Sequence, residues 1–105
     1  MTFAPAVPVA DLPDGEPRRV VVDGTPVCLV RVGETVHAVS DLCSHADVSL
    51  SEGEVDDTTI ECWLHGSRFD LITGKPTGLP ATRAIPVYPV SVHDGTVLVD
   101  TRPEA

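Results

Sequence analysis

Cys43-Ser44-His45 and Cys62-Trp63-Leu64-His65 are the two stretches that say most about the fold of this chain. Each offers one thiolate and one imidazole from a short segment, and residues 46–61 separate them. Both side chains are ligands of transition metals, so the sequence predicts a metal site built from two loops. Zinc modules more often carry their cysteines first and their histidines on a following helix, with four ligands around one ion. The alternating order found here favours a different centre.

A binuclear iron–sulfur cluster makes use of this alternation. A 2Fe-2S cluster needs two terminal ligands for each iron, and two loops can place both cysteines on one iron and both histidines on the other. Neutral imidazoles in place of two thiolates leave the cluster less negative, so adding an electron is easier than in an all-thiolate site. The sequence predicts such a 2Fe-2S cluster, with a mononuclear zinc or iron site as the alternative.

The residues around both pairs resemble the cluster-binding segment of Rieske-type ferredoxins. Gly66-Ser67, then Phe69-Asp70, then Thr73-Gly74-Lys75-Pro76 follow the second pair. The similarity is strongest from about residue 41 to residue 88. It implies an all-β Rieske fold, an antiparallel β sandwich that carries one Rieske-type 2Fe-2S cluster at one tip.

The resemblance also implies the roles of the four ligands. Cys43 and Cys62 are expected to bind the inner iron as thiolates. His45 and His65 are expected to bind the outer iron, each through one ring nitrogen. Their imidazole edges are expected at the protein surface, where the electron enters and leaves.

Four further residues are expected to influence the cluster. Ser67 matches a family serine whose hydroxyl donates to a bridging sulfide, although it could also be a simple turn serine. Phe69 replaces a tyrosine whose hydroxyl, in high-potential relatives, donates to a ligand cysteine. Trp63 and its neighbour Leu64 either shield the cluster or present a rim for docking. Pro80 falls where the family has a proline-containing loop over the cluster, with a plain connecting loop as the alternative.

The same comparison predicts the range of the reduction potential. High-potential Rieske proteins carry an extra cysteine in each cluster loop, and the two cysteines form a disulfide. Val48 and Leu64 stand at those places in this chain. Together with the missing hydroxyl at Phe69, this predicts a potential near the low end of the Rieske range of roughly −150 to +300 mV.

Outside the ligand pairs, β-branched runs separated by turn residues predict antiparallel strands. Asp23-Gly24, Gly33-Glu34 and Asp94-Gly95 are the turn signals of hairpins. The predicted strands occupy 18–23, 26–32, 35–40, 85–93 and 96–100.

The turn-rich stretch between these runs, from about 41 to 80, contains all the ligands. We interpret it as a cluster-binding subdomain inserted in a β scaffold, within one Rieske domain spanning 1–105. Residues 1–6 and 101–105 are expected to fray.

A chain of 105 residues allows one domain that folds alone. It leaves no room for the catalytic domain of a Rieske oxygenase, in which two histidines and a carboxylate hold a mononuclear iron. We interpret the remaining histidines, His37 and His93, as solvent-facing strand residues. Cys28 lies in an apolar run and is interpreted as a buried structural thiol. No internal disulfide is expected, because the other two cysteines bind iron.

The net charge of −9 bears on the partners of the chain. It disfavours nucleic acid and anionic lipid, and it would speed association with a basic docking surface. A solvated loop is the simpler explanation for the acidic residues between the ligand pairs. No apolar run is long enough to span a membrane, and the amino-terminal residues do not resemble a secretion signal. The chain is therefore expected to be cytoplasmic. The acidic residues are Glu52, Glu54, Asp56, Asp57 and Glu61.

The sequence contains no catalytic triad, phosphate-binding glycine loop or nucleotide fingerprint, so we do not expect an enzyme. The resemblance implies a soluble carrier that takes one electron from a flavin-dependent reductase and passes it to a terminal oxygenase.

Three alternatives remain open. The runs 43–54 and 78–83 also resemble small ferredoxins encoded among iron–sulfur assembly genes, whose partner is an assembly or repair system. A zinc-stabilised binding module is the second alternative. A redox sensor or regulatory subunit of a larger reductase is the third.

Overall fold

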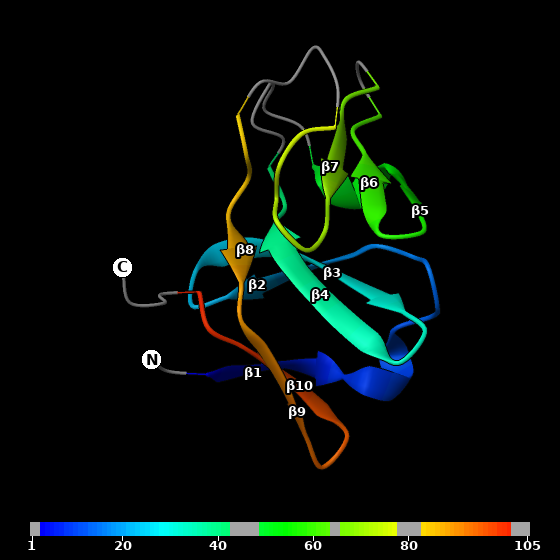
Figure 1. Cartoon of the computed structure of the whole chain (residues 1–105). Coiled ribbons are helices and arrows are strands. Elements are labelled where there is room, and N and C mark those ends of the chain that lie inside the picture. The colour runs from blue at the N-terminus through cyan, green and yellow to red at the C-terminus, as the bar shows by residue number, and fades with distance from the viewer. Residues whose placement is uncertain (1–2, 43–48, 64–65, 78–82, 102–105) are drawn as a thin grey trace.

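The computed structural model describes residues 3–42, 49–63, 66–77 and 83–101. Within these ranges the regular structure is ten β-strands and two short 3-10 helices, η1 (Val9–Asp11) and η2 (Leu50–Glu52). The strands form three antiparallel sheets, which lie one above another in Figure 1. This confirms the prediction of an all-β chain. Within the described ranges, no helix is long and apolar enough to cross a membrane.

The central sheet consists of β2 (Arg18–Val22), β3 (Thr25–Val32), β4 (Thr35–Ser40) and β8 (Val87–Tyr88), in that order. Asp23 and Gly24 join β2 to β3 with φ angles of 49° and 77°. Two successive positive φ angles are what a type I′ turn requires, and its twist matches that of the strands it joins. The hairpins predicted between residues 18 and 40 are confirmed.

The lower sheet in Figure 1 has the order β1-β10-β9, with β1 at Ala4–Pro8, β10 at Thr96–Val99 and β9 at Val90–His93. The expectation that residues 1–6 fray is wrong from Ala4 onward, because β1 pairs with β10 from Ala4↔Val99 to Pro8↔Thr96. β1 is an edge strand, where proline is tolerated because one side of the strand needs no hydrogen-bond donor. The strand was missed because its prolines resemble a loop.

The predicted strand 85–93 is also wrong in one respect, because Pro89 divides it. Proline has no N–H to donate to a ladder. The segment before Pro89 is β8, which pairs with β4 in the central sheet, whereas the segment after it is β9, which pairs with β10. A single run of sequence therefore links two sheets.

The upper sheet has the order β5-β6-β7 and consists of three-residue strands. These strands are β5 (Glu54–Asp56), β6 (Thr59–Glu61) and β7 (Arg68–Asp70). Ile60 in β6 pairs with both Val55 and Phe69, so apolar side chains of all three strands share one face. This sheet forms one end of the molecule (Figure 1).

Two buried clusters fill the spaces on either side of the central sheet. Successive side chains of β3 point to opposite faces, so that Cys28 and Val30 enter one cluster and Val27 and Leu29 the other. A strand that is buried on both faces has apolar residues at successive positions, which explains the apolar run from Val27 to Val30. Burying one large apolar side chain contributes about 1.5–3 kcal/mol to stability. The upper core consists of Cys28, Val30, Val39, Leu50, Ile60, Cys62, Phe69, Leu71 and Ile85.

Candidate metal centre

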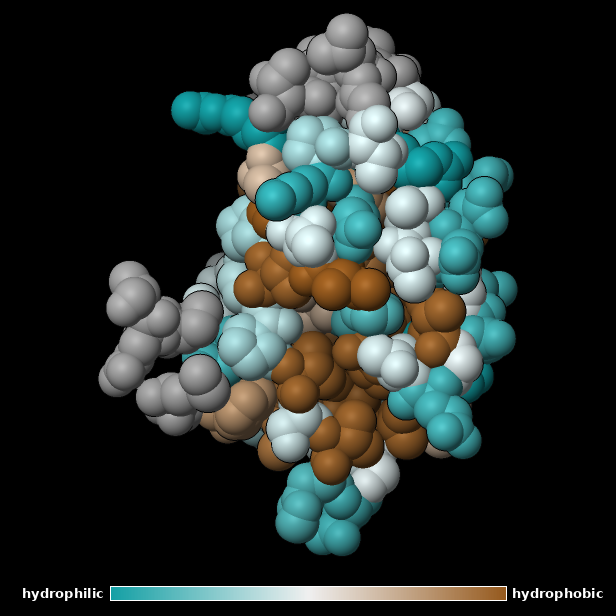
Figure 2. All heavy atoms as spheres, viewed as in Figure 1, coloured by the Kyte–Doolittle hydropathy of each residue, from teal (hydrophilic) through white to brown (hydrophobic). Residues whose placement is uncertain are grey.

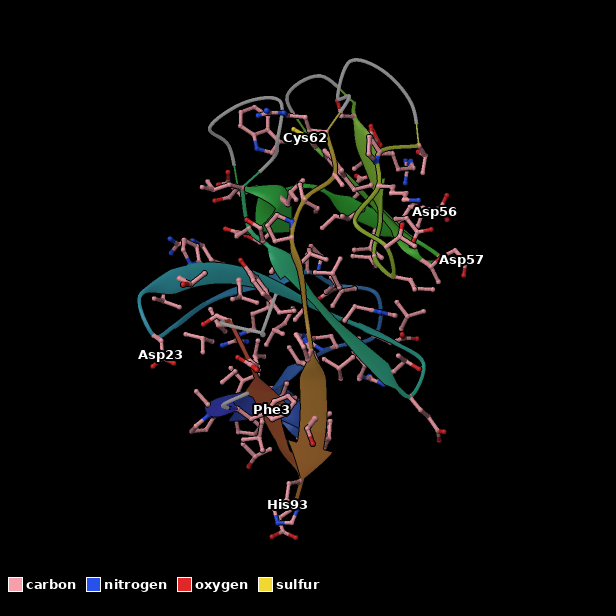
Figure 3. All side chains as sticks on the ribbon, turned by 60° about the vertical axis from the view of Figure 1, so that its left-hand side comes forward. Phe3, Asp23, Asp56, Asp57, Cys62 and His93 are labelled. Atoms are coloured by element: carbon pink, nitrogen blue, oxygen red, sulfur yellow. The ribbon has the colours of Figure 1, made fainter. Side chains whose placement is uncertain are left out.

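Cys62 lies directly after β6 and is fully buried in the upper core. Its N–H donates to the carbonyl of Ser67 at 2.6 Å, and its carbonyl accepts the N–H of Gly66 at 3.0 Å. Gly66 has a φ of 75°, which a residue without a Cβ adopts at little cost. These bonds close the turn between β6 and β7, which contains the second Cys-His pair. Figure 3 shows Cys62 at the opposite end of the molecule from His93.

Backbone contacts likewise join the two sides of the first ligand segment. Leu42 and Ser49 form an isolated antiparallel bridge. The N–H of Leu50 donates to the carbonyl of Asp41 at 2.7 Å. The side chain of Asp41 accepts the N–H of Ser51 at 2.9 Å. The chain is thus fixed immediately before and after residues 43–48.

The structure describes four of the predicted site residues: Cys62, Trp63, Ser67 and Phe69. Cys43, His45, His65 and Pro80 lie outside the described residues. Their predicted roles stay predictions. In the part of the chain that is described, no three His, Cys, Asp or Glu side chains gather as a metal site.

The surroundings of Cys62 fit a thiolate ligand of iron. The residue is 0% exposed and packs in the upper core with Leu50, Ile60 and Phe69. A thiolate buried alone among apolar groups would be costly, whereas coordination to a metal cation offsets that cost. Cysteine sulfur is also the donor that iron–sulfur clusters select. The donor chemistry at this position therefore suits the predicted cluster.

Ser67 and Phe69 both lie on the buried side of β7 or at its start. Ser67 is fully buried, and its carbonyl holds the N–H of Cys62. Phe69 is 0% exposed, pairs with Ile60 across the sheet and shares the upper core with Cys62. An aromatic ring without a hydroxyl thus occupies the core that contains a predicted ligand.

Trp63 follows Cys62 in sequence but is exposed, at 51%. With Glu52, Gly53, Glu54 and Glu61 it lines a groove of about 280 Å³. An exposed indole beside three carboxylate side chains fits the docking-rim interpretation better than the shielding one. Hydrophilic residues also gather over β5 and β6 on the face seen in Figure 2.

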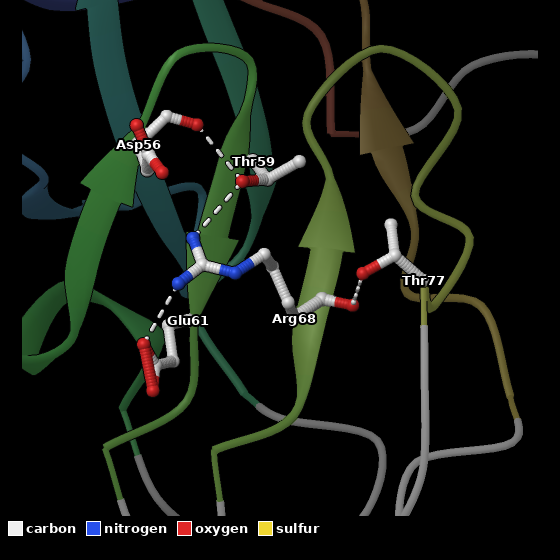
Figure 4. A network of polar contacts seen from close by, with 5 residues as sticks. All are labelled: Asp56, Thr59, Glu61, Arg68 and Thr77. Carbon is white, nitrogen blue, oxygen red and sulfur yellow. Dashed lines mark hydrogen bonds and ion pairs between the residues drawn. The ribbon is translucent and has the colours of Figure 1, made fainter.

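A polar network joins β6 and β7 beside the second Cys-His pair (Figure 4). Arg68 Nη2 lies 2.8 Å from Glu61 Oε2, and Arg68 Nη1 donates to Thr59 Oγ1 at 3.0 Å. Thr77 Oγ1 donates to the Arg68 carbonyl at 3.2 Å. Glu61 and Arg68 are directly opposite one another in the ladder. This pair was not predicted, because its only signal in the sequence is opposite charge at the ends of two short runs.

The remaining histidines and cysteine are placed as follows. His93 is exposed, as predicted, and lies 3.4 Å from the carboxylate of Asp94. His37 is half-buried rather than solvent-facing, and burial lowers its pKa from the usual value. The earlier interpretation of His37 is therefore wrong, because β4 is flanked there by the 71–72 turn and β8, which line one groove with it. Cys28 is a free, fully buried thiol, as predicted, and burial raises its pKa.

A comparison with known protein families now identifies the chain. The family described as "Rieske [2Fe-2S] domain" matches residues 2–89. This chain belongs to the Rieske family. Membership decides between the mononuclear site and the binuclear cluster, so the Rieske chain carries one Rieske-type 2Fe-2S cluster.

Individual relatives are similar along nearly the whole Rieske chain. The 3-phenylpropionate/cinnamic acid dioxygenase ferredoxin subunit of Escherichia coli (strain K12) is 48% identical over 102 residues, covering 95% of this chain and 93% of the relative. The ferredoxin of carbazole 1,9a-dioxygenase from Nocardioides aromaticivorans IC177 has a TM-score of 0.91 and 40% identity, covering 94% and 97%.

A second similar structure is a complex of reduced oxygenase and oxidized ferredoxin in carbazole 1,9a-dioxygenase, with a TM-score of 0.86 and 37% identity. The match covers 92% of this chain and 100% of that chain. These relatives are electron-transfer subunits rather than catalytic ones, and the prediction that this chain is not an enzyme is confirmed.

Proposed function

We propose that this Rieske protein carries single electrons from a flavin-dependent reductase to the terminal oxygenase of a ring-hydroxylating dioxygenase system. The end-to-end similarity to ferredoxin subunits of such systems is the observation that carries this function. One of these similar ferredoxins is bound to its oxygenase. The bound cluster supplies storage of one electron at a time.

Cys43, His45, Cys62 and His65 are the ligands in this proposal. The support is their order and spacing in the sequence, the burial of Cys62, and the backbone bonds that fix the chain at the base of both ligand segments. Cys62 is held by two backbone bonds inside the upper core. That placement excludes water from the thiolate side of the site.

The same proposal assigns 1–105 to a single Rieske domain whose cluster-binding part spans about 41–80. The three-stranded upper sheet supports this division, because among the described strands β5, β6 and β7 form a sheet separate from the other two. The upper core joins this part to β3 and β4 of the central sheet. The two parts therefore share one hydrophobic core.

Trp63 marks the docking face of the proposed carrier. It is half-exposed, is next in sequence to a proposed ligand, and lines a groove with Glu52, Glu54 and Glu61. Complexes between electron-transfer partners are short-lived and have small interfaces, so a single aromatic anchor with a charged rim suits them. A basic surface on the partner would complement the net charge of −9.

The carrier is proposed to work in the cytoplasm. Cys28 and Cys62 are free cysteines, as expected in a reducing compartment, where thiolate ligands also persist. Fractionation of cells that express the protein from its own gene would test this location.

Substitution into a known system tests the function directly. Purified protein replaces the ferredoxin subunit of the Escherichia coli 3-phenylpropionate/cinnamic acid dioxygenase system, and stopped-flow spectroscopy follows its reduction and reoxidation. Reduction by the reductase and reoxidation on adding the oxygenase support the function. Cys62→Ser, which removes a proposed ligand, serves as the inactive control. A protein with an intact cluster that neither component oxidises nor reduces would contradict it.

A further inference from the structure

Asp41 is a fully buried acid at the base of the first ligand segment, two positions before Cys43. Its N–H donates to the carbonyl of Pro26 at 3.2 Å, and its carbonyl accepts the N–H of Leu50 at 2.7 Å. Its Oδ1 accepts the N–H of Ser51 at 2.9 Å. One residue thus ties β3 of the central sheet to η2 on the far side of the first ligand segment.

The second oxygen of this carboxylate lies beside one cation of the described residues, Arg19. Asp41 Oδ2 lies 3.1 Å from Arg19 Nε, and the side chain of Asp41 is 1% exposed whereas that of Arg19 is 51% exposed. Oδ2 accepts no hydrogen bond from the described residues, so its contact with Arg19 is an ion pair only. A buried carboxylate is costly unless it is paired. Arg19 therefore offsets the charge of Asp41 only in part.

The charge of Asp41 acts on the core that contains a proposed ligand. Arg19 pairs with Cys28 across the β2–β3 ladder, and Cys28 packs in the upper core with Cys62. The negative charge of Asp41 is one of the causes that raise the pKa of Cys28, after burial itself. Because the core is apolar, charges there are screened less than at the surface.

We propose that Asp41 and Arg19 form a positioning pair for the cluster. The Asp41 carboxylate anchors the first ligand segment, and the balance between its charge and that of Arg19 sets how easily the cluster accepts an electron. This inference rests on the proposed ligand set. A negative charge close to the site opposes reduction, so removing it makes the potential more positive. Removing the cation leaves the carboxylate less compensated and makes the potential more negative.

Two variants test the pair with opposite expected signs. Asp41→Asn keeps an oxygen that can accept the N–H of Ser51 but removes the charge. Arg19→Gln removes the cation from a half-exposed side chain, so it is expected to fold. Protein-film voltammetry is expected to show a positive shift of the midpoint for Asp41→Asn and a smaller negative shift for Arg19→Gln. Asp41→Asn is also expected to lose its visible absorbance several times faster in the presence of a chelator.

Matched controls separate this role from general effects. Arg18→Gln makes the same charge change on the neighbouring, exposed residue of β2. Asp100→Asn changes another fully buried acid, beyond the end of β10. Neither control is expected to move the midpoint.

The outcomes are decisive for each variant. Equal midpoints for Arg19→Gln and Arg18→Gln would overturn the electrostatic role even if Asp41→Asn failed to fold. Shifts of the same sign in Asp41→Asn and Arg19→Gln would indicate a loosened structure and would also overturn it. A wild-type protein without a Rieske spectrum would instead refute the ligand set.

Discussion

Phe69 affects the predicted potential because its ring carries no hydroxyl group. Its ring is buried in the upper core with Cys62, where a hydroxyl would have little competition from water. A hydrogen bond to a ligand sulfur stabilises the reduced cluster more than the oxidised one, because the reduced cluster is more negative. The absence of this donor is the residue-scale reason to expect a low potential.

Phe69→Tyr is therefore expected to raise the midpoint potential. The added hydroxyl can donate to a ligand sulfur, and charge-assisted hydrogen bonds are about twice as strong as neutral ones. Protein-film voltammetry measures the shift. Phe69→Leu keeps an apolar side chain without a hydroxyl and is expected to leave the midpoint close to that of the native protein. An unchanged midpoint in the tyrosine variant would refute the assignment.

Trp63→Ala is expected to weaken transfer to the oxygenase without changing the potential. Truncating a tryptophan anchor at an interface commonly costs about 2 kcal/mol or more, roughly a thirtyfold loss in apparent affinity. The dependence of the reoxidation rate on oxygenase concentration measures this effect. Trp63→Phe retains an aromatic surface, so its apparent affinity for the oxygenase is expected to lie between those of the native protein and Trp63→Ala. If Trp63→Ala transferred electrons normally, the docking face would lie elsewhere.

At the scale of elements, the turn after β7 is fixed against the irregular segment that leads to β8. The Asp70 carboxylate accepts the N–H groups of Ile72 and Thr73 at 2.7 and 3.2 Å. The N–H of Ile85 donates to the Gly74 carbonyl at 2.8 Å. A Cβ built on Gly74 would meet the Ile85 carbonyl oxygen. The turn depends on a residue without a side chain.

Gly74→Ala and Gly95→Ala form a matched pair that tests this close approach. Both glycines have a φ of 76°, but a Cβ on Gly95 meets nothing within 4 Å. Gly95→Ala is expected to cost about 1–2 kcal/mol for the backbone conformation alone. Gly74→Ala has the same backbone cost and adds the steric clash with the Ile85 carbonyl. Its loss of unfolding free energy, measured in urea, is therefore expected to be clearly larger. Equal losses would show that the backbone contact is unimportant.

The elements also show which features can be predicted from sequence. Asp23-Gly24 and Asp94-Gly95 carry the chemistry of their own turns, so the hairpins beside them were predictable. Strands β5 to β7 have three residues each, too few for an alternating pattern, and they depend on packing over the upper core. The pairing of β1 with the distant β10 has no local signal either.

The metal centre shows the same division between local and distant signals. The two Cys-His pairs could be predicted as ligands from their order and spacing in the sequence. The contact between Asp41 and Arg19 was missed, because it joins two segments that only the fold brings together.

At the scale of the whole molecule, hydrophilic and apolar residues lie on different parts of the surface. Hydrophilic residues cover the side of the upper sheet, whereas apolar residues occupy much of the middle and lower part of the face in Figure 2. The proposed ligand Cys62 lies at the upper end (Figure 3). Trp63, the next residue in sequence, lines the groove with Glu52, Glu54 and Glu61.

The rate of electron transfer to the oxygenase is accordingly expected to fall as salt is added. A net charge of −9 accelerates encounter with a basic surface at low ionic strength, and salt screens this attraction over about 10 Å at 0.1 M. Second-order rate constants measured between 20 mM and 500 mM sodium chloride test the effect. Sodium chloride leaves the contact at Trp63 largely intact, so a rate independent of salt would mean that the apolar contact alone guides docking.

Visible and EPR spectroscopy of anaerobically purified protein tests the central claim most directly. A Rieske 2Fe-2S cluster gives a red-brown protein with two irons and two sulfides per chain, and an EPR signal of low average g value after reduction. Cys62→Ser should lose both signals. A colourless native preparation that holds one tetrahedral metal ion per chain would contradict the account.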